Sequence, residues 1–95
     1  MFGFEKVPYV TQQIEHRSGV LYVAIGVSAG GVNLPAATSL GVPARITTVP
    51  YGTQQAAVVT SRSAAEAEQA LRAVCGDAVP VRRRDLERIA SHYVR

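Results

Sequence analysis

The sequence contains no tryptophan, and phenylalanine and tyrosine together make up only 6% of its residues. The hydrophobic core must therefore consist mainly of valine, alanine, leucine and isoleucine, within an apolar fraction of 47%. That fraction, with only 18% charged residues, excludes a disordered chain. A length of 95 residues fits a single globular domain, residues 1–95, and excludes a large enzyme with two lobes.

Residues that form disulfides or bind metals are also scarce. The single Cys75 excludes an internal disulfide, and the first residues lack the basic-then-apolar order of a secretory signal, so we expect a cytoplasmic protein. His16, Cys75 and His92 are far apart in the sequence and show no metal-ligand spacing. We therefore expect neither a metal nor another cofactor.

Only one of the ten basic residues is a lysine, and this composition, with its many alanines and valines, is typical of a high-GC bacterial genome. The net charge of +3 is unevenly distributed. Residues 1–81 carry five basic and five acidic side chains, whereas residues 82–95 carry five arginines against Asp85 and Glu87. The C-terminal segment therefore favours, at most, an acidic partner.

Charge is missing altogether from residues 18–44, a run of 27 residues that is long enough to cross a bilayer. The run contains five glycines and two prolines among polar residues, which is not the composition of a membrane-spanning helix. We expect a buried strand, a loop and a helix here, and no contact with a membrane.

Residues 64–75 carry the strongest helix signals in the sequence. Ser63 and Glu66 form a capping box at the start, and Gly76 stands where a helix favours a left-handed residue after its end. Apolar residues recur at helical spacing, so one face is predicted to be buried. Cys75 falls in the last turn, where the negative end of the helix dipole disfavours a thiolate, so we expect it to pack rather than react.

The remaining core elements follow from shorter patterns. The apolar run 20–27 predicts a buried central strand, and residues 35–40 predict a short helix between Pro35 and Gly41. The β-branched runs 45–49 and 55–60, separated by a turn at residues 50–53, predict an antiparallel hairpin.

The two ends of the chain are predicted from weaker patterns. Residues 78–82 can form a brief edge strand in which Pro80 is tolerated, and residues 83–95 are predicted to form a basic, amphipathic C-terminal helix. Residues 1–19, interrupted by Pro8, can form either an edge strand or an N-terminal arm.

The order of these elements predicts an α+β fold. Within residues 20–82 the order is βαββαβ, the split βαβ arrangement of ferredoxin-like folds. We therefore expect a four-stranded antiparallel sheet with both core helices on one face. The other sheet face must then be covered by a second subunit or by the terminal segments, so a homodimer is expected.

Within residues 20–76, a family resemblance is carried by residues 23–26 with 30–32, residues 41–48, residues 57–59 and residues 67–74. The whole range 20–76 resembles the ACT-type regulatory domains of aspartate kinases. The resemblance implies that an amino acid or similar metabolite binds at a dimer interface, between the loop after the first strand and the start of the second. Pro43 stands where these domains carry an effector-binding asparagine.

The same loop has features that favour a ligand on physical grounds. Gly30 and Gly31 can expose backbone N–H groups ahead of a helix, and such groups attract a carboxylate or a phosphate. The expected ligand-binding residues are Gly30, Gly31, Asn33, Thr47 and Thr48. The alternative is that the two glycines only make a tight turn.

Residues 23–31 also resemble the nucleophile loop of chemotaxis protein-glutamate methylesterases. The resemblance implies that Ser28 attacks an ester, as a remote alternative to a protein without catalytic activity. A serine nucleophile needs a base within hydrogen-bonding distance. The base and the acid would have to come from His16, His92, Asp77 and Asp85.

The C-terminal arginines form the main charged feature of the sequence. The residues concerned are Arg82, Arg83, Arg84 and Arg88. They can form a solvated face, pair with acidic residues of another subunit, or bind a protein partner. Nucleic acid is not the expected partner, because few aromatic residues accompany the charge. The sequence thus predicts a small non-catalytic regulatory module, with an assembly or adaptor protein as the alternative.

Overall fold

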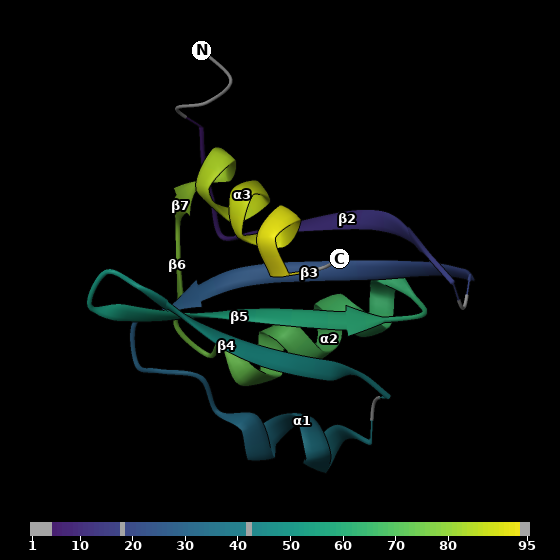
Figure 1. Ribbon diagram of the computed structural model, residues 1–95. Helices are drawn as coiled ribbons and strands as arrows, with labels where there is room; N and C mark the ends of the chain where they lie inside the picture. Colours follow the sequence, from purple (N-terminus) through teal and green to yellow (C-terminus); the bar gives the residue numbers. More distant parts are fainter. Residues whose placement is uncertain (1–4, 18, 42, 94–95) are drawn as a thin grey trace.

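The computed structural model describes residues 5–17, 19–41 and 43–93 (Figure 1). These residues form three helices and seven strands. In chain order they are β1 (Lys6–Val7), β2 (Tyr9–His16), β3 (Gly19–Ser28), α1 (Leu34–Leu40), β4 (Arg45–Tyr51), β5 (Gln54–Ser61), α2 (Ala64–Val74), β6 (Ala78–Val79), β7 (Val81–Arg82) and α3 (Arg83–Tyr93).

The main sheet is antiparallel, as expected, but it has five strands instead of four. Its order is β2-β3-β5-β4, and the short β6 pairs with the end of β3 beyond the reach of β2. The fifth strand is β2, which comes from the N-terminal segment and pairs with β3 from Tyr9↔Gly26 to His16↔Gly19. Of the two alternatives for that segment, the structure contains the edge strand.

The single edge strand expected over residues 78–82 is divided in two at Pro80. Ala78–Val79 pairs with β3, whereas Val81–Arg82 pairs with β1 in a separate two-stranded sheet. Proline has no N–H to continue a ladder of hydrogen bonds, so the chain changes partner there.

The sheet lies between two layers of helices, because alternate residues of each strand face opposite sides (Figure 1). On one face, α1 and α2 pack against a core of small side chains that includes Ala24, Ala57 and Val59. On the other face, Leu86 and Ala90 of α3 are buried in one cluster with Val23 and Ile25 of β3 and Val58 of β5. The C-terminal helix therefore covers the face for which a second subunit was one candidate.

The ends of the helices confirm two sequence signals and correct a third. The Ser63 side chain accepts a hydrogen bond from the Glu66 N–H, and Gly41 adopts φ 68° after α1. Gly76, however, does not have a positive φ. Cys75 is the residue after α2, and the N–H of Asn33 donates to the Val74 carbonyl at 2.9 Å. A neighbouring loop thus satisfies the end of α2 without a left-handed glycine.

The turn between β4 and β5 is tighter than the expected residues 50–53. Tyr51 pairs with Gln54, so only Gly52 and Thr53 lie in the turn, and Gly52 has φ 60°. A positive φ at the first position of a two-residue turn is typical of the type II′ hairpin. Pro50 is therefore part of β4, at the edge of the sheet.

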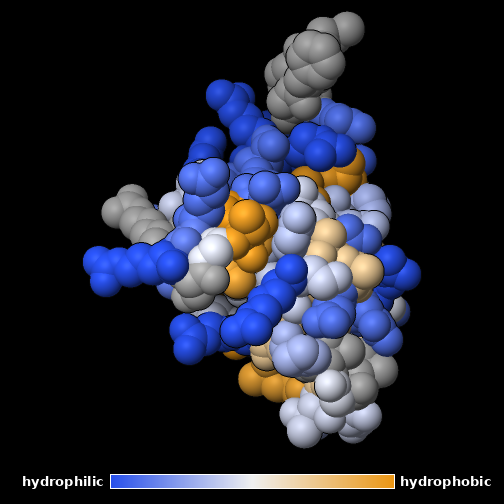
Figure 2. All heavy atoms as spheres, turned by 90° about the vertical axis from the view of Figure 1, so that its right-hand side faces the viewer, coloured by the Kyte–Doolittle hydropathy of each residue, from blue (hydrophilic) through white to orange (hydrophobic). Residues whose placement is uncertain are grey.

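Polar residues cover most of the surface. Figure 2 shows the end of the molecule that carries the turn between β2 and β3, where hydrophilic side chains surround smaller hydrophobic areas. The large hydrophobic side chains with most exposure are Val20 and Leu34, at 45% and 46%. Among the described residues, no helix is long and apolar enough to cross a membrane.

Candidate functional site

The glycine-containing loop between β3 and α1 is held in place by hydrogen bonds to the rest of the protein. The Ser28 hydroxyl donates to the Gly31 carbonyl at 2.7 Å, and the Val32 N–H donates to Gln55 Oε1 at 3.0 Å. The N–H of Ala29 donates to the Asp77 carbonyl at 3.2 Å. Together with the Asn33 N–H described above, three loop N–H groups are therefore engaged within the protein.

The charge next to this loop does not favour an anion. A Cβ placed on Gly30 would lie 3.7 Å from Asp77 Oδ2. A carboxylate at this distance opposes binding of a second negative group. In addition, α1 is only seven residues long, and it has no side-chain cap at Asn33. The loop geometry is thus explained by a tight turn, for which Gly31 supplies φ 87°.

The structure brings only some of the expected ligand-binding residues together. Gly30, Gly31 and Asn33 are neighbours in the loop. Thr48 lies on the sheet face that packs against α1 and α2, because it alternates with Ile46 of that face. Thr48 and Gln55 line an open hollow of about 470 Å³ at the β4–β5 turn. Thr47 points to the opposite face, because successive residues of a strand alternate, so it does not approach the loop.

A second group of candidates, the arginines at the C-terminal end, lies on and next to α3. Arg83 Nε forms an exposed ion pair with Glu5 Oε2 at 3.3 Å, and the N–H of Arg83 donates to the Glu5 carbonyl. Arg84 and Arg88 are exposed and one helical turn apart, so their side chains share a face. Within the described part of the chain, neither of these two has an acidic partner.

Beside this face lies a hollow of about 330 Å³ between α3 and the β4–β5 turn. Its lining residues are Pro50, Tyr51, Gly52, Asp85, Arg88 and Ile89. The Tyr51 hydroxyl donates to Asp85 Oδ2 at 2.6 Å across the hollow. This hydrogen bond is the main reason that the pKa of Tyr51 is raised, with smaller contributions from burial and from the Asp85 charge, while Arg82 opposes the shift.

No sequence pattern predicts this hollow. Tyr51 lies at the turn between β4 and β5, and its partner Asp85 is 34 residues further along the chain. Gly52, directly after Tyr51, indicates the turn. It does not indicate the contact between Tyr51 and Asp85, because that contact depends on how α3 packs across the sheet.

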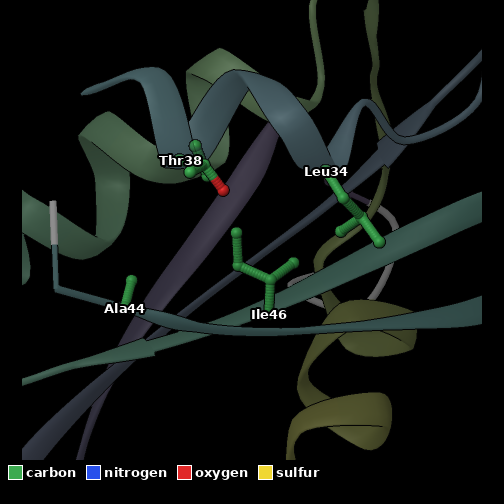
Figure 3. A pocket seen from close by; sticks show the side chains of 5 residues that line it. Leu34, Thr38, Ala44 and Ile46 are labelled. Atoms are coloured by element: carbon green, nitrogen blue, oxygen red, sulfur yellow. The ribbon is translucent and has the colours of Figure 1, made fainter. Parts of the chain in front are cut away.

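A third hollow, of about 280 Å³, lies between α1 and β4 (Figure 3). Leu34, Ala37 and Thr38 line it from α1, and Ala44 and Ile46 line it from the other side. The side chains of Thr38 and Leu34 lie above Ile46, with Ala44 at the opposite end of the hollow from Leu34.

Within the described residues, Ser28 lacks the surroundings that a serine nucleophile requires. Ser28 is only 1% exposed, and its hydroxyl is engaged with the Gly31 carbonyl. His16 pairs with Gly19 at the other end of β3, which is about 30 Å away at the rise of a β-strand. His92 is on α3, across the sheet from Ser28. In the part of the chain that the structure describes, neither histidine therefore lies within hydrogen-bonding distance of this serine.

Cys75 packs in the core, as expected, and its burial raises the pKa of its thiol. In residues 5–17, 19–41 and 43–93, no three His, Cys, Asp or Glu side chains are grouped so that they could hold a metal ion. No protein-family model, curated protein or solved structure matches the chain.

Proposed function

We propose that this chain is a non-catalytic adaptor that binds an acidic, extended segment of another protein through one face of α3. The observation that carries the proposal is the pair Arg84 and Arg88, exposed and adjacent beside the hollow that contains Ile89. Two arginines on one helix face attract carboxylates, and arginine binds carboxylates well through its planar group of donors.

The hollow adds an apolar component to this charged face. Ile89 and Pro50 offer apolar surface beside Arg88, so a partner side chain such as leucine could lie between them while neighbouring carboxylates contact the arginines. The Tyr51–Asp85 hydrogen bond joins α3 to the hairpin, which keeps the two walls of the hollow in a fixed relation. A preformed surface loses less conformational freedom when a partner binds.

We also infer that the core is a ferredoxin-like split βαβ unit. β3 and β4 run parallel, are joined by α1 and have β5 between them, and α2 leads from β5 to β6 beside β3. These relations support the inference, although β6 is short and β2 occupies most of the same side of β3.

A second candidate function is the regulatory one implied by the ACT resemblance, in which an amino acid or similar metabolite binds near Gly30, Gly31 and Asn33. The hollow lined by Thr48 and Gln55 favours it, because Gln55 also bonds to the loop. The nearby Asp77 carboxylate would suit the ammonium group of an amino acid rather than its carboxylate. A small-molecule ligand would therefore lie at the hairpin end of the loop.

The adaptor proposal can be tested with a fluorescein-labelled peptide of alternating glutamate and leucine. We expect its fluorescence anisotropy to report binding that weakens as salt is added, because exposed charges are screened. The double variant Arg84→Ser/Arg88→Ser should raise the dissociation constant about tenfold or more.

The matched control for this experiment is Arg17→Ser/Arg62→Ser, which removes the same charge from two exposed arginines elsewhere. If both double variants lose binding equally, the loss is caused by the change in net charge. That result would contradict a site on α3. Absence of binding to the wild-type protein, combined with a thermal shift by one free amino acid that Thr48→Val abolishes, would favour the regulatory function.

A further inference from the structure

The outer edge of β4 has backbone groups that no other described strand uses. β4 forms one edge of the main sheet, and among the described strands it pairs with β5 alone. Tyr51 and Gln54 close a two-residue turn and so form a hydrogen-bonded pair, after which hydrogen-bonded and non-hydrogen-bonded pairs alternate. The backbone groups of Ile46 and Thr48, which lie opposite Val59 and Ala57, therefore point away from β5.

The two ends of this edge are protected against pairing, but its middle is not. Pro50 has no N–H to offer at the next outward position, and Arg45 places a charge at the start of the strand. Between them, residues 46–49 are uncharged and without proline. An extended strand could therefore pair with the outward groups of Ile46 and Thr48.

The hollow between α1 and β4 lies next to this edge (Figure 3). Ile46 points into it, and Leu34 of α1, 46% exposed, lies at the end toward which β4 continues to Thr48. A strand added beside β4 would place alternate side chains beneath α1, because alternate residues face the same side. Apolar side chains at those positions would cover Leu34 and Ile46.

We propose that the strand that occupies this edge is β4 of a second copy of the chain, paired antiparallel about a two-fold axis at Thr47. In this register Thr47 lies opposite the partner's Thr47, and Ile46 lies opposite the partner's Thr48. The two outward-facing residues of each copy then form two hydrogen-bonded pairs across the axis. The main sheets of the two copies become one continuous sheet.

The side chains of β4 are compatible with this self-pairing. Arg45 lies opposite the partner's Val49, so no like charges meet, and threonine pairs well with threonine across a strand pair. The partner's Ile46 lies opposite Thr48, on the sheet face that carries α1, and its side chain covers Leu34. A closed two-fold contact of this kind uses the same surface in both subunits.

Both sheet faces are packed against helices of the same chain, so direct pairing between the sheets of two copies would use an edge. This interface does not involve Arg84 or Arg88, and it goes beyond the proposed adaptor function without depending on it.

The register can be tested with Thr47→Cys in the full-length chain. Residues in a non-hydrogen-bonded pair have Cα atoms about 4.5 Å apart, within the range of a disulfide. We expect mild oxidation to convert most of this variant to a disulfide-linked dimer on a non-reducing gel. Thr53→Cys, at the exposed turn, is the matched control and should remain largely monomeric. The wild type, whose Cys75 is buried, should do the same. Equal linkage in both variants would contradict the register.

The interface itself can be tested by sedimentation velocity at rising protein concentration. We expect reversible dimers of the wild type, monomers of Thr47→Lys and of Thr47→Glu alone, and dimers again when these two variants are mixed. Only a register that places position 47 opposite itself predicts recovery in the mixture. If Thr47→Lys and Thr47→Glu each form dimers alone, the contact lies on another surface. If the wild type stays monomeric and Thr47→Cys does not cross-link, the proposal is overturned.

A proline at position 48 separates edge pairing from folding. Thr48→Pro removes an outward N–H that β5 does not use, so β4 should still pair with β5, as it does with Pro50 in place. We expect unchanged circular dichroism and loss of the dimer, whereas Thr48→Val should still dimerise. Dimerisation of Thr48→Pro equal to that of Thr48→Val would contradict the proposal.

Discussion

The hydroxyl of Tyr51 donates a 2.6 Å hydrogen bond to Asp85 Oδ2, joining the β4–β5 hairpin to α3. The two residues are 34 positions apart in the sequence, and α3 lies on the sheet face opposite α1 and α2. Both residues also line the hollow next to Arg88. Its loss should therefore affect both stability and binding.

We expect Tyr51→Phe to lower the free energy of unfolding by about 1 kcal/mol, since it removes a partly exposed hydrogen bond to a carboxylate. Urea denaturation measures this change. Tyr22→Phe serves as the control, because Tyr22 is also partly buried but makes no hydrogen bond through its hydroxyl in the described residues. Equal effects of both substitutions would show that the Asp85 contact contributes nothing particular.

The same contact predicts how stability depends on alkaline pH. The pKa of Tyr51 is raised from 10.0 in the folded state, chiefly by its hydrogen bond to Asp85. A raised pKa means that the folded protein holds this proton more tightly than the unfolded chain does. The contribution is fully present below pH 10.0 and is lost as the pH rises through the folded-state pKa.

Absorbance of the phenolate during an alkaline titration measures this pKa. Tyr51 should ionise above the ordinary range of a tyrosine, and Asp85→Asn should move its transition back toward that range. An Asp85→Asn titration curve identical to that of the wild type would contradict the assigned cause.

Gly26 is expected to tolerate no side chain. A Cβ at this position would lie 3.1 Å from the Pro8 carbonyl oxygen, next to β2, and 3.4 Å from Leu71 Cδ2 of α2. We expect Gly26→Ala to destabilise the fold by about 1–3 kcal/mol through overpacking. Gly76→Ala is the control, since its Cβ would meet nothing within 4 Å, and thermal denaturation should show it unchanged or slightly stabilised.

The capping box at the start of α2 gives another prediction. The Ser63 hydroxyl accepts the Glu66 N–H at 3.4 Å, and removing this acceptor in Ser63→Ala should cost about 0.5–1 kcal/mol. Ser63→Asp should retain most of the stability, because aspartate is also a favourable N-cap. Loss of stability in the aspartate variant as large as that in the alanine variant would show that the cap is unimportant.

Sequence signals that act within a few residues predicted their elements well. The hydrogen bonds that mark these helix ends are local. Ser63 accepts from the Glu66 N–H at the start of α2, and the Gly41 N–H donates to the Thr38 carbonyl at the end of α1. The prediction of a left-handed Gly76 was wrong. Asn33, from a loop that is distant in the sequence but adjacent in space, donates to the Val74 carbonyl at the end of α2 instead. No local signal announces such a partner.

The same distinction explains the candidate sites. The arginines of α3 are visible in the sequence, and so is the glycine loop, but their surroundings are not. Whether Gly30 lies beside a cation or beside Asp77 depends on the packing of α2 and the strand after it. Thr47 and Thr48 are neighbours in sequence, yet the strand places them on opposite faces, so only one can approach the loop.

The helix that carries the arginines also forms part of the hydrophobic core. Leu86 and Ala90 are buried against Val23, Ile25 and Val58. A chain cut after residue 82 would present this side of the sheet to water as a wide apolar surface, open to chaperones and proteases. In a cell, we therefore expect a chain that lacks the last helix to be degraded. It would not persist as a folded domain that has lost only its ability to bind a partner.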